Sequence, residues 1–484
     1  MPQDSVRIEH RYLELPDAFY TRVAPTPLRD AKLVCFNQSL AAEMGFHTAN
    51  PAQWTGIGAG TELLAGMDPV AMKYTGHQFG AYNPELGDGR GLLLWETLGP
   101  DGRRWDWHLK GAGTTPYSRF GDGRAVLRST IREYLCSEAM AALGIPTTRA
   151  LFMVSAKDPV RRESLETAAT LVRVAQTHIR FGHFEFAAYH QGEDALKALL
   201  EHTIRYHFPH LLALPDEQRN RRWLEEVVTR TATLIAQWQV VGFCHGVMNS
   251  DNMSIIGDTF DYGPFAFLDD FDAGHICNHT DQGGRYAYNR QPHIGYINCQ
   301  YLARALMPIL PEEDIRQALE LYGDAYNSHF LDSMRAKLGL AEDDASDIDL
   351  TMALFALLHT HKVDYTLFFR NLSNLAGNGD APVRDLFVDR EAADVWLARY
   401  RARLTKETRS AEAREAAMRA VNPKYVLRNY LAQLVIQEAQ NGDYGPLEEL
   451  LKVLAQPFAE QPEFERYAAP PPDWGKHLNI SCSS

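Results

Sequence analysis

Alternating polar and apolar positions in the first part of the chain predict β-strands. The segment Gly91–Glu96 is mostly apolar, and Trp105–Lys110 alternates between apolar and polar side chains, as half-buried strands do. Between them, residues 99–102 read Gly-Pro-Asp-Gly, which has the composition of a turn. Leu171–Val174 also has a strand-like composition. We therefore expect a region of mixed structure with several strands from about residue 68 to 180.

Helical periodicity first becomes strong at Ala125–Leu143, where apolar side chains recur on a single stripe. Gly144 and Pro146 follow at positions that end helices. Helix then dominates from about residue 190, and residues 221–240 again carry apolar side chains at helical spacing. The exception is Asn252–Phe271, which we expect to form two short strands around a Gly-Asp turn.

Strand-rich sequence followed by helical sequence is the order found in protein kinases, an analogy at the level of the fold alone. We therefore predict an α+β, protein-kinase-like fold of two lobes, with an N-terminal extension and additional C-terminal helices. Residues 300–460 are predicted to be helical apart from an acidic, solvated stretch at 342–347. The expected boundaries are an N-terminal extension at 1–67, a phosphate-binding N-lobe at 68–185, a helical C-lobe at 186–465 and a tail at 466–484.

The composition narrows the functional classes. Lys and Arg total 48 against 62 Asp and Glu, so the net charge of −14 disfavours binding to a nucleic-acid backbone. No apolar stretch is long enough to cross a membrane, and the N-terminus lacks the apolar centre of a signal peptide. The six cysteines have no C-x-x-C spacing, which argues against a structural zinc site. We expect a cytoplasmic, bacterial-type protein that binds neither membranes nor nucleic acid.

Lys110 ends a predicted strand and is followed by a helix that contains two candidate carboxylates. Protein kinases use such a lysine, paired with a helix glutamate, to hold nucleotide phosphates. Periodicity does not choose between Glu133 and Glu138, although Glu138 lies nearer the apolar stripe. A lone lysine at a strand end is most often only a solvated surface charge, so its interpretation depends on the motifs around it.

Glycine-rich segments lie on both sides of this lysine, at Leu86–Gly91, Gly111–Gly113 and Gly121–Arg124. Glycine lets backbone N–H groups approach phosphate closely, and nearby arginines add paired donors. Each segment alone is more often just a turn. Together with the arginines they favour a site for phosphate groups.

Three arginines, Arg124, Arg128 and Arg132, are spaced four residues apart and would stack on one helix face. Like charges at that spacing repel each other. Two explanations stay open: surface carboxylates that neutralise the arginines, or a facing polyanion such as a triphosphate.

The strongest chemical signal is a pair of motifs in the helical half of the chain. His245-Gly-x-x-x-x-Asp251-Asn252 has the spacing of the kinase catalytic loop. The Asp-Tyr-Gly sequence that begins at Asp261 corresponds to the metal-binding aspartate of kinases, and Asn252 and Asp261 are oxygen ligands suited to Mg²⁺. Val247 occupies the position of the usual catalytic base, and Asp251 is the carboxylate that could replace it.

A displaced base favours chemistry at a different phosphate. If the nucleotide is turned in the cleft so that its α-phosphate faces the nucleophile, the product carries a nucleotidyl group instead of a phosphoryl group. Two alternatives remain: a phosphotransferase that acts on a small molecule, and a nucleotide-binding pseudokinase scaffold without turnover. The retained set of lysine, asparagine and aspartates argues against the scaffold.

With these motifs the chain resembles the selenoprotein O family, from about residue 15 to its end. The matching segments are Lys73–Gly80, Leu86–Arg90, Lys110–Arg119, Ser129–Glu133, His245–Asn249, Asn422–Tyr425 and Ser481–Ser484. The resemblance implies a pseudokinase fold that transfers AMP from ATP to Ser, Thr or Tyr hydroxyls of other proteins, with UTP as a second donor. It also implies a nucleotide turned around relative to kinases, and a site that uses Mg²⁺ or Mn²⁺.

The resemblance further implies roles for individual residues. Asp251 resembles the proton acceptor, Asn252 and Asp261 resemble the Mg²⁺ ligands, and Glu133 resembles the partner of the lysine. The residues that it implies at the nucleotide are Gly87, Gly89, Arg90, Lys110, Asp122, Gly123, Arg173, Arg180 and Asp261.

Two cysteines carry another expectation from the resemblance. Cys482 occupies the position where some relatives carry selenocysteine, and Cys277 follows the Asp-Tyr-Gly motif at a distance typical of an activation segment. We expect oxidation to join these thiols in a regulatory intramolecular disulfide, with two unrelated free cysteines as the alternative. The expected partners are ATP and hydroxyl-bearing protein substrates, and we expect a monomer.

Overall fold

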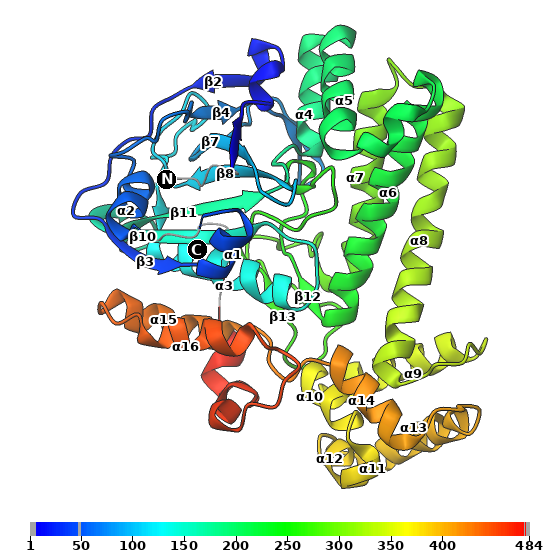
Figure 1. Cartoon of the computed structure of the whole chain (residues 1–484). Coiled ribbons are helices and arrows are strands. Elements are labelled where there is room, and N and C mark those ends of the chain that lie inside the picture. The colour runs from blue at the N-terminus through cyan, green and yellow to red at the C-terminus, as the bar shows by residue number, and fades with distance from the viewer. Residues whose placement is uncertain (1–5, 47–49, 479, 481–484) are drawn as a thin grey trace.

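A large antiparallel sheet forms the N-terminal lobe, and helices form most of the remaining molecule (Figure 1). The computed structural model describes residues 6–46, 50–478 and 480. Within these residues the sheet has nine strands, in the order β2-β4-β7-β8-β11-β10-β3 with β1 beside β7 and β9 beside β11. They are β1 (Arg7–Glu9), β2 (Tyr20–Arg22), β3 (Lys32–Phe36), β4 (Val70–Met72), β7 (Gly91–Leu98), β8 (Arg104–Lys110), β9 (Ala125–Val126), β10 (Arg149–Arg161) and β11 (Leu165–Ala175). The predicted α+β class and the three predicted strands are confirmed.

The register of the central strands decides which side chains share a face with Lys110. Strand β8 lies between β7 and β11, and Lys110 is opposite Gly91 on one side and Leu171 on the other. Two residues earlier, His108 is opposite Arg173 of β11. Because side chains alternate along a strand, Lys110, His108 and Arg173 lie on the same face of the sheet.

The residues expected to form an N-terminal extension are part of this sheet and cover its other face. Strand β3 pairs with β10, and β2 pairs with β4. Helices α1 (Gln38–Glu43) and α2 (Pro51–Ala59) follow, and Trp54 of α2 stacks on Trp107 of β8. Trp107 lies three residues before Lys110, so this apolar layer covers the face opposite to the one that carries the lysine.

Helix α3 (Leu127–Ala142) packs on the same face as Lys110. Its residue Leu135 belongs to one buried core with Leu171, which is directly opposite the lysine in the register. The helix begins two residues later than predicted because the preceding pair of residues forms β9, which is hydrogen bonded to β11. The sheet therefore fixes the start of the helix.

The three regularly spaced arginines do not form a common face. Arg124 precedes α3 and donates to backbone carbonyl groups of the N-terminal segment. Arg128 pairs with Glu166 at 2.7 Å. Arg132 is buried and donates to the carbonyl oxygen of Phe265 at 3.0 Å. Of the two explanations left open, neutralisation by a carboxylate applies to Arg128, and the three arginines do not face one polyanion together.

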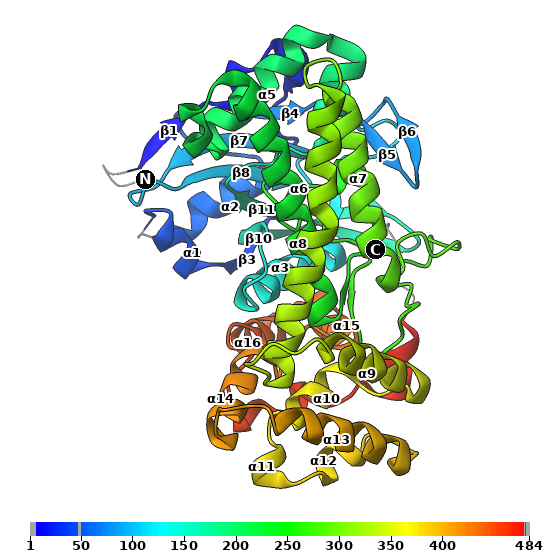
Figure 2. The same cartoon turned by 90° about the vertical axis from the view of Figure 1, so that its right-hand side faces the viewer.

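Helices make up most of the chain from α4 onward, as predicted (Figure 2). Helices α6 and α8 pack side by side with α7 against both, while α15 and α16 return to pack on α3 of the N-lobe. No helix in the described part of the chain is long and apolar enough to span a membrane. The helices are α4 (Phe181–Phe186), α5 (Glu193–His207), α6 (Asp216–Val241), α7 (Gln291–Leu306), α8 (Glu312–Leu338), α9 (Asp347–His361), α10 (Tyr365–Leu372), α11 (Leu375–Asn378), α12 (Ala381–Arg384), α13 (Arg390–Leu404), α14 (Ala411–Val421), α15 (Asn429–Gln440) and α16 (Gly445–Leu454).

The strand pair predicted within Asn252–Phe271 is wrong. In this fully described segment the one strand is β13 (Ala266–Phe267), and it pairs with β12 (Phe243–Cys244) outside the segment. The backbone ahead of β13 forms hydrogen bonds to distant residues instead, for example from the Thr259 N–H to the carbonyl oxygen of Pro146 at 2.9 Å. Tertiary hydrogen bonds therefore replace the local pairing that the Gly-Asp turn suggested.

The acidic stretch at 342–347 does separate two helices, but it is not wholly solvated as expected. Asp347, the first residue of α9, is completely buried. It accepts hydrogen bonds from Arg335 at 2.9 Å and from Arg403 at 2.6 Å. This carboxylate therefore joins three helices of the C-lobe.

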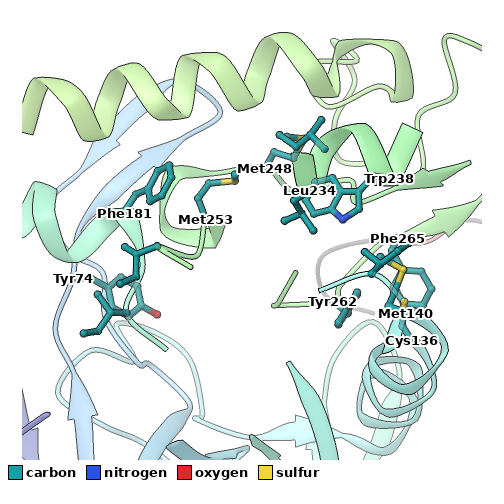
Figure 3. Close-up of a cluster of buried hydrophobic side chains, with 14 of the residues drawn as sticks. Tyr74, Cys136, Met140, Phe181, Leu234, Trp238, Met248, Met253, Tyr262 and Phe265 are labelled. Carbon is teal, nitrogen blue, oxygen red and sulfur yellow. The ribbon is translucent and has the colours of Figure 1, made fainter. Parts of the chain in front are cut away.

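Buried side chains from both lobes meet around the catalytic-loop motif (Figure 3). Met248 within the motif and Met253 just after it belong to the same core as Phe181 of α4, Trp238 of α6 and Cys136 of α3. Close packing of this kind leaves little freedom for the backbone between the two methionines. The loop is therefore held at both ends by apolar contacts.

Lys337 on α8 is a buried cation that has no ion-pair partner among the described residues. Its ammonium lies 4.2 Å from the ring centre of Phe369 and 5.5 Å from that of Tyr365. Burial lowers the pKa of Lys337 to about 7. An unfolded lysine titrates near pH ~10.4, so the unfolded chain binds more protons between these two values. This residue therefore makes the stability of the protein rise as the pH increases from about 7 to about 10.

We expect Lys337→Met to remove that pH dependence and to raise the free energy of unfolding at pH 7 by about 1–4 kcal/mol. Urea unfolding between pH 6 and 10 measures both effects. Lys476→Met is the matched control, because Lys476 is partly exposed and pairs with Asp270 at 2.8 Å. If the free energies of unfolding of Lys337→Met and the wild type changed in parallel with pH, the prediction would be contradicted.

Candidate active site

One cavity of about 720 Å³ between the two lobes brings the predicted site residues together. The glycine-rich loops of the N-lobe line one side, and the catalytic-loop motif lines the other. Glu133 is not part of the lining but lies directly behind it, where it forms an ion pair with Lys110. The predicted residues in the lining are Gly87, Gly89, Arg90, Lys110, Asp122, Gly123, Arg173, Arg180, Asp251, Asn252 and Asp261.

The lysine at the end of β8 forms an ion pair with Glu133 of α3. Glu133 is almost completely buried, and its other carboxylate oxygen lies 3.2 Å from Arg173. The alternative, Glu138, pairs with Arg149 at 2.7 Å. Burial lowers the pKa of Lys110, and the charge of Glu133 opposes that decrease. The structure thus decides the choice that helical periodicity leaves open.

Two buried arginines hold the aspartate of the Asp-Tyr-Gly motif. Arg173 of β11 pairs with one oxygen of Asp261, and Arg180 pairs with the other at 2.6 Å. The Arg180 guanidinium also lies over the rings of Tyr74 and Phe260, 4.6 and 4.5 Å from their centres. Burial alone would raise the pKa of Asp261, but the charges of Arg180 and Arg173 outweigh it and hold the pKa well below its usual value. Asp261 is therefore ionised at neutral pH.

Asp251 lies in a short 3-10 helix, Ser250–Asn252, and is almost fully buried. Its Oδ2 accepts a hydrogen bond from Gln78 Nε2 at 3.3 Å. Its Oδ1 is buried and has no hydrogen-bond partner among the described residues. Burial raises the pKa of Asp251 to about 7 despite the opposing charge of Arg180. A carboxylate in the cavity lining with this pKa can take up a proton near neutral pH.

Asn252 and Asp261 offer oxygen atoms to a divalent cation. The amide nitrogen of Asn252 donates to the carbonyl oxygen of Val247 at 3.1 Å, so its amide oxygen points away from that bond. Within the described residues, no three or more His, Cys, Asp or Glu side chains are grouped to hold a metal. Mg²⁺ often takes only one or two protein oxygens and completes its shell with water and substrate phosphates. The oxygens of Asn252 and Asp261, both in the cavity lining, fit such an ion.

The first residues of the catalytic-loop motif are fixed by backbone contacts. His245 Nε2 lies 3.0 Å from the carbonyl oxygen of Phe260, the residue before Asp261. Gly246 has a φ of +80°, and a Cβ at this position would lie 2.6 Å from the sulfur of Cys277. Glycine is therefore required here for both its conformation and its size. These contacts couple the positions of the two motifs.

The glycine-rich loop at Leu86–Arg90 is held by Asp88, a residue for which sequence reasoning gave no role. Asp88 is buried and lies 2.9 Å from His108 Nε2. It also accepts hydrogen bonds from the Tyr74 hydroxyl at 3.3 Å and from the Met72 N–H at 3.2 Å. The position of this carboxylate between two glycines was the one sign of its role in the sequence. The residues that it contacts are distant in sequence, so the spacing did not reveal them.

The second glycine-rich segment is held by its own ion pair. Asp122 pairs with Arg162 at 2.7 Å and accepts a hydrogen bond from the backbone N–H of Arg124 at 2.9 Å. Gly123 has a φ of +69°, and a Cβ there would lie 2.0 Å from the carbonyl carbon of Gly113. These contacts shape the cavity wall, and the role of Asp122 toward a nucleotide stays a prediction.

The thiol of Cys277 is buried beside a second cysteine. Its Sγ lies 3.3 Å from that of Cys244, and both are free thiols. Cys482, its expected disulfide partner, lies outside the described residues. Ile480 is described, and its carbonyl oxygen accepts a hydrogen bond from the His279 N–H at 3.1 Å. The C-terminal tail therefore reaches the segment that carries Cys277.

Known protein sequences match this chain over almost its whole length. The family model "Protein adenylyltransferase SelO" matches residues 2–455. The chain is 53% identical over 487 residues to the "Protein nucleotidyltransferase YdiU" of Vibrio cholerae serotype O1, with 99% of each sequence covered. The proteins of the same name from Myxococcus xanthus and Aliivibrio fischeri are each 52% identical, again with 99% of each sequence covered.

Proposed function

The chain belongs to the SelO family of protein adenylyltransferases, and on that premise we propose that it transfers AMP from ATP to Ser, Thr or Tyr hydroxyls of protein substrates. The position of Asp251 carries this proposal. It is a buried carboxylate with a raised pKa, in the wall of a cavity that is also lined by eight cationic side chains. UTP is a second donor under the same proposal.

The cationic side chains support binding of a triphosphate. They are Arg90, Lys110, Arg119, Arg124, Arg161, Arg162, Arg173 and Arg180. The carboxylates in this lining or directly behind it are fewer, so a positive excess remains in a chain whose net charge is −14; they are Asp88, Asp122, Glu133, Asp251 and Asp261. Partial exclusion of water strengthens each interaction between these groups and phosphate oxygens.

In the proposed reaction, an acceptor hydroxyl attacks the α-phosphorus of the nucleotide. Asp251 accepts the hydroxyl proton while the new oxygen–phosphorus bond forms. The bond from the α-phosphorus to the bridging oxygen of the β-phosphate breaks, and pyrophosphate leaves with that electron pair. Lys110 and Arg173 stabilise the charge on the departing pyrophosphate. This arrangement requires a nucleotide turned around relative to one in a kinase.

Asn252 and Asp261 are the proposed ligands of Mg²⁺ or Mn²⁺. When bound, such a cation would neutralise phosphate charge and help to align the α-phosphate. Arg173 and Arg180 contribute by keeping the Asp261 carboxylate ionised and fixed in orientation.

ATP labelled separately at the α- and γ-phosphates tests the proposal. We expect dephosphorylated β-casein to retain the α-label and not the γ-label after incubation with the protein and MgCl₂. Retention of the γ-label alone would favour the second candidate, a phosphotransferase, which the kinase-like motif order supports. Retention of neither label by any acceptor would favour a binding scaffold.

We also propose a regulatory disulfide between Cys277 and Cys482, supported by the contact of Ile480 with His279. We expect mild peroxide to produce a linked peptide pair in non-reducing mass spectrometry, and Cys482→Ser to remove it. Because Cys244 lies 3.3 Å from Cys277, the competing product is a Cys244–Cys277 bond. Detection of that bond alone would contradict the proposed pairing.

A further inference from the structure

A two-stranded hairpin beside the cavity belongs to no larger sheet. Strands β5 (Gly76–Gln78) and β6 (Ala81–Asn83) pair with each other and with no other described strand. Figure 2 shows the hairpin projecting beside α7, away from the main sheet. Its residues Gln78 and Phe79 line the same cavity as Asp251.

Hydrogen bonds fasten this hairpin to the catalytic loop. The His77 N–H donates to Ser250 Oγ at 2.7 Å. The Ser250 hydroxyl donates in turn to Glu185 of α4, which is completely buried and lies 2.5 Å from His77 Nδ1. At the turn, the Phe79 N–H lies 3.3 Å from the side-chain oxygen of Asn249. The hairpin is therefore fixed relative to the loop that carries the proposed base.

Gln78 connects the hairpin directly to the proposed base. Its Nε2 donates to Asp251 Oδ2 at 3.3 Å, and its Oε1 accepts from Asn83 at 3.2 Å. The bond from Asn83 fixes the orientation of the Gln78 amide, with its nitrogen toward the carboxylate. The hydrogen bond to Oδ2 therefore fixes the orientation of the Asp251 carboxylate, whose Oδ1 is buried without a partner among the described residues.

Phe79 holds a conformation that an aromatic residue rarely adopts. Its φ is +50°, and that of the following Gly80 is +84°. For a side chain larger than glycine this backbone costs about 1–2 kcal/mol. Phe79 is nevertheless 43% exposed, and the centre of its ring lies 5.0 Å from that of Tyr286. Burial of the ring does not account for the strain, and strained residues cluster at sites that bind ligands.

The chemistry of the hairpin distinguishes it from the wall that faces the phosphates. Residues 76–83 contain no Lys, Arg, Asp or Glu, whereas the cationic side chains of the cavity come from the N-lobe sheet and its loops. An exposed ring and an uncharged amide suit a polypeptide better than a polyphosphate. The hairpin therefore favours a polypeptide, whereas the cationic wall of the cavity favours phosphate groups.

We propose that the β5–β6 hairpin is the docking element for the polypeptide segment that carries the acceptor hydroxyl. Phe79 contacts a side chain next to the acceptor residue, and Gln78 is a positioning residue that keeps Asp251 oriented for proton transfer. This inference rests on the proposed nucleotidyl transfer, because it assigns the acceptor side of that reaction.

Phe79→Gly tests the docking contact without adding backbone strain. We expect the Michaelis constant for dephosphorylated β-casein to rise about tenfold, because the variant loses an aromatic anchor. We expect no change with N-acetyltyrosinamide, which has no neighbouring residues to dock. Thermal unfolding should show no loss of stability, since glycine relieves the positive φ. The affinity for ATP should also be unchanged.

Trp474→Ala is the matched control, because Trp474 is 48% exposed and packs against Tyr430 of α15. It should leave both Michaelis constants unchanged. An unchanged Michaelis constant for casein in Phe79→Gly, with an active wild type, would contradict the docking role. An equal rise of the Michaelis constants for casein and for N-acetyltyrosinamide in Phe79→Gly would also contradict the docking role. A wild type that transfers no α-label would contradict the proposed function itself.

Gln78→Ala should give the complementary pattern. We expect kcat to fall about tenfold with both casein and N-acetyltyrosinamide, as loss of a hydrogen bond to a charged group predicts. The Michaelis constants should change little. A rise in the casein Michaelis constant without a fall in kcat would contradict the positioning role and assign Gln78 to docking instead.

Discussion

Asp261→Asn is expected to lower nucleotidyl transfer by at least about 10³-fold and to remove the divalent-cation dependence of ATP binding. Asparagine keeps the shape of the side chain and tolerates the φ of +59° found at this position. It removes the charge that both a metal ion and the guanidinium groups of Arg173 and Arg180 require. Calorimetric titration with ATP, with and without MgCl₂, measures the loss of cation dependence.

The same substitution is expected to destabilise the fold. Arg173 and Arg180 are buried, so they would remain as cations that lack their shared partner. Breaking a buried ion pair on one side costs about 3–5 kcal/mol, which urea unfolding would detect. Asp270→Asn is the control, because Asp270 forms a partly exposed pair with Lys476. An Asp261→Asn protein that keeps Mg²⁺-dependent ATP affinity would show that the metal ligands lie elsewhere.

Features fixed by short spacing could be predicted from the sequence. The order of the catalytic-loop and Asp-Tyr-Gly motifs, together with Lys110 at a strand end, was enough to expect one cleft between two lobes. The structure brings Lys110, Asp251 and Asp261 into one cavity. Such motifs are readable because each places several chemically necessary groups within a few residues.

Features fixed by tertiary contacts could not be predicted. Helical periodicity alone did not choose between Glu133 and Glu138; the family resemblance implied Glu133, and the ion pair of Glu133 with Lys110 agrees with it. Asp88 and Gln78 have partners that are remote in sequence, so no spacing rule assigns them a role. The predicted strand pair at Asn252–Phe271 failed for the same reason, because its backbone bonds to other segments.

Asp251→Asn is expected to reduce nucleotidyl transfer by about 10²–10⁴-fold, the usual contribution of a positioned general base. The substituted amide would be unable to accept the hydroxyl proton, whereas the cationic side chains that face the phosphates stay in place. ATP affinity should therefore change little. Single-turnover transfer of α-label to casein measures the rate, and calorimetry measures the affinity. An equal loss of rate and affinity would indicate that Asp251 holds the metal or the fold instead.

The two aspartate substitutions should have opposite effects on stability, which separates their roles. Burial raises the pKa of Asp251 to about 7, above its unfolded value near ~3.9, so the wild type loses stability as the pH rises between these values. Asp251→Asn removes this penalty and should be more stable than the wild type at pH 8, with the difference vanishing toward pH 4. The pKa of Asp261 is held low, so its charge stabilises the fold at neutral pH, and Asp261→Asn should be less stable there.

A base retained at a cost in stability is expected only where function requires the charge. Loss of stability in Asp251→Asn at pH 8 would contradict this assignment.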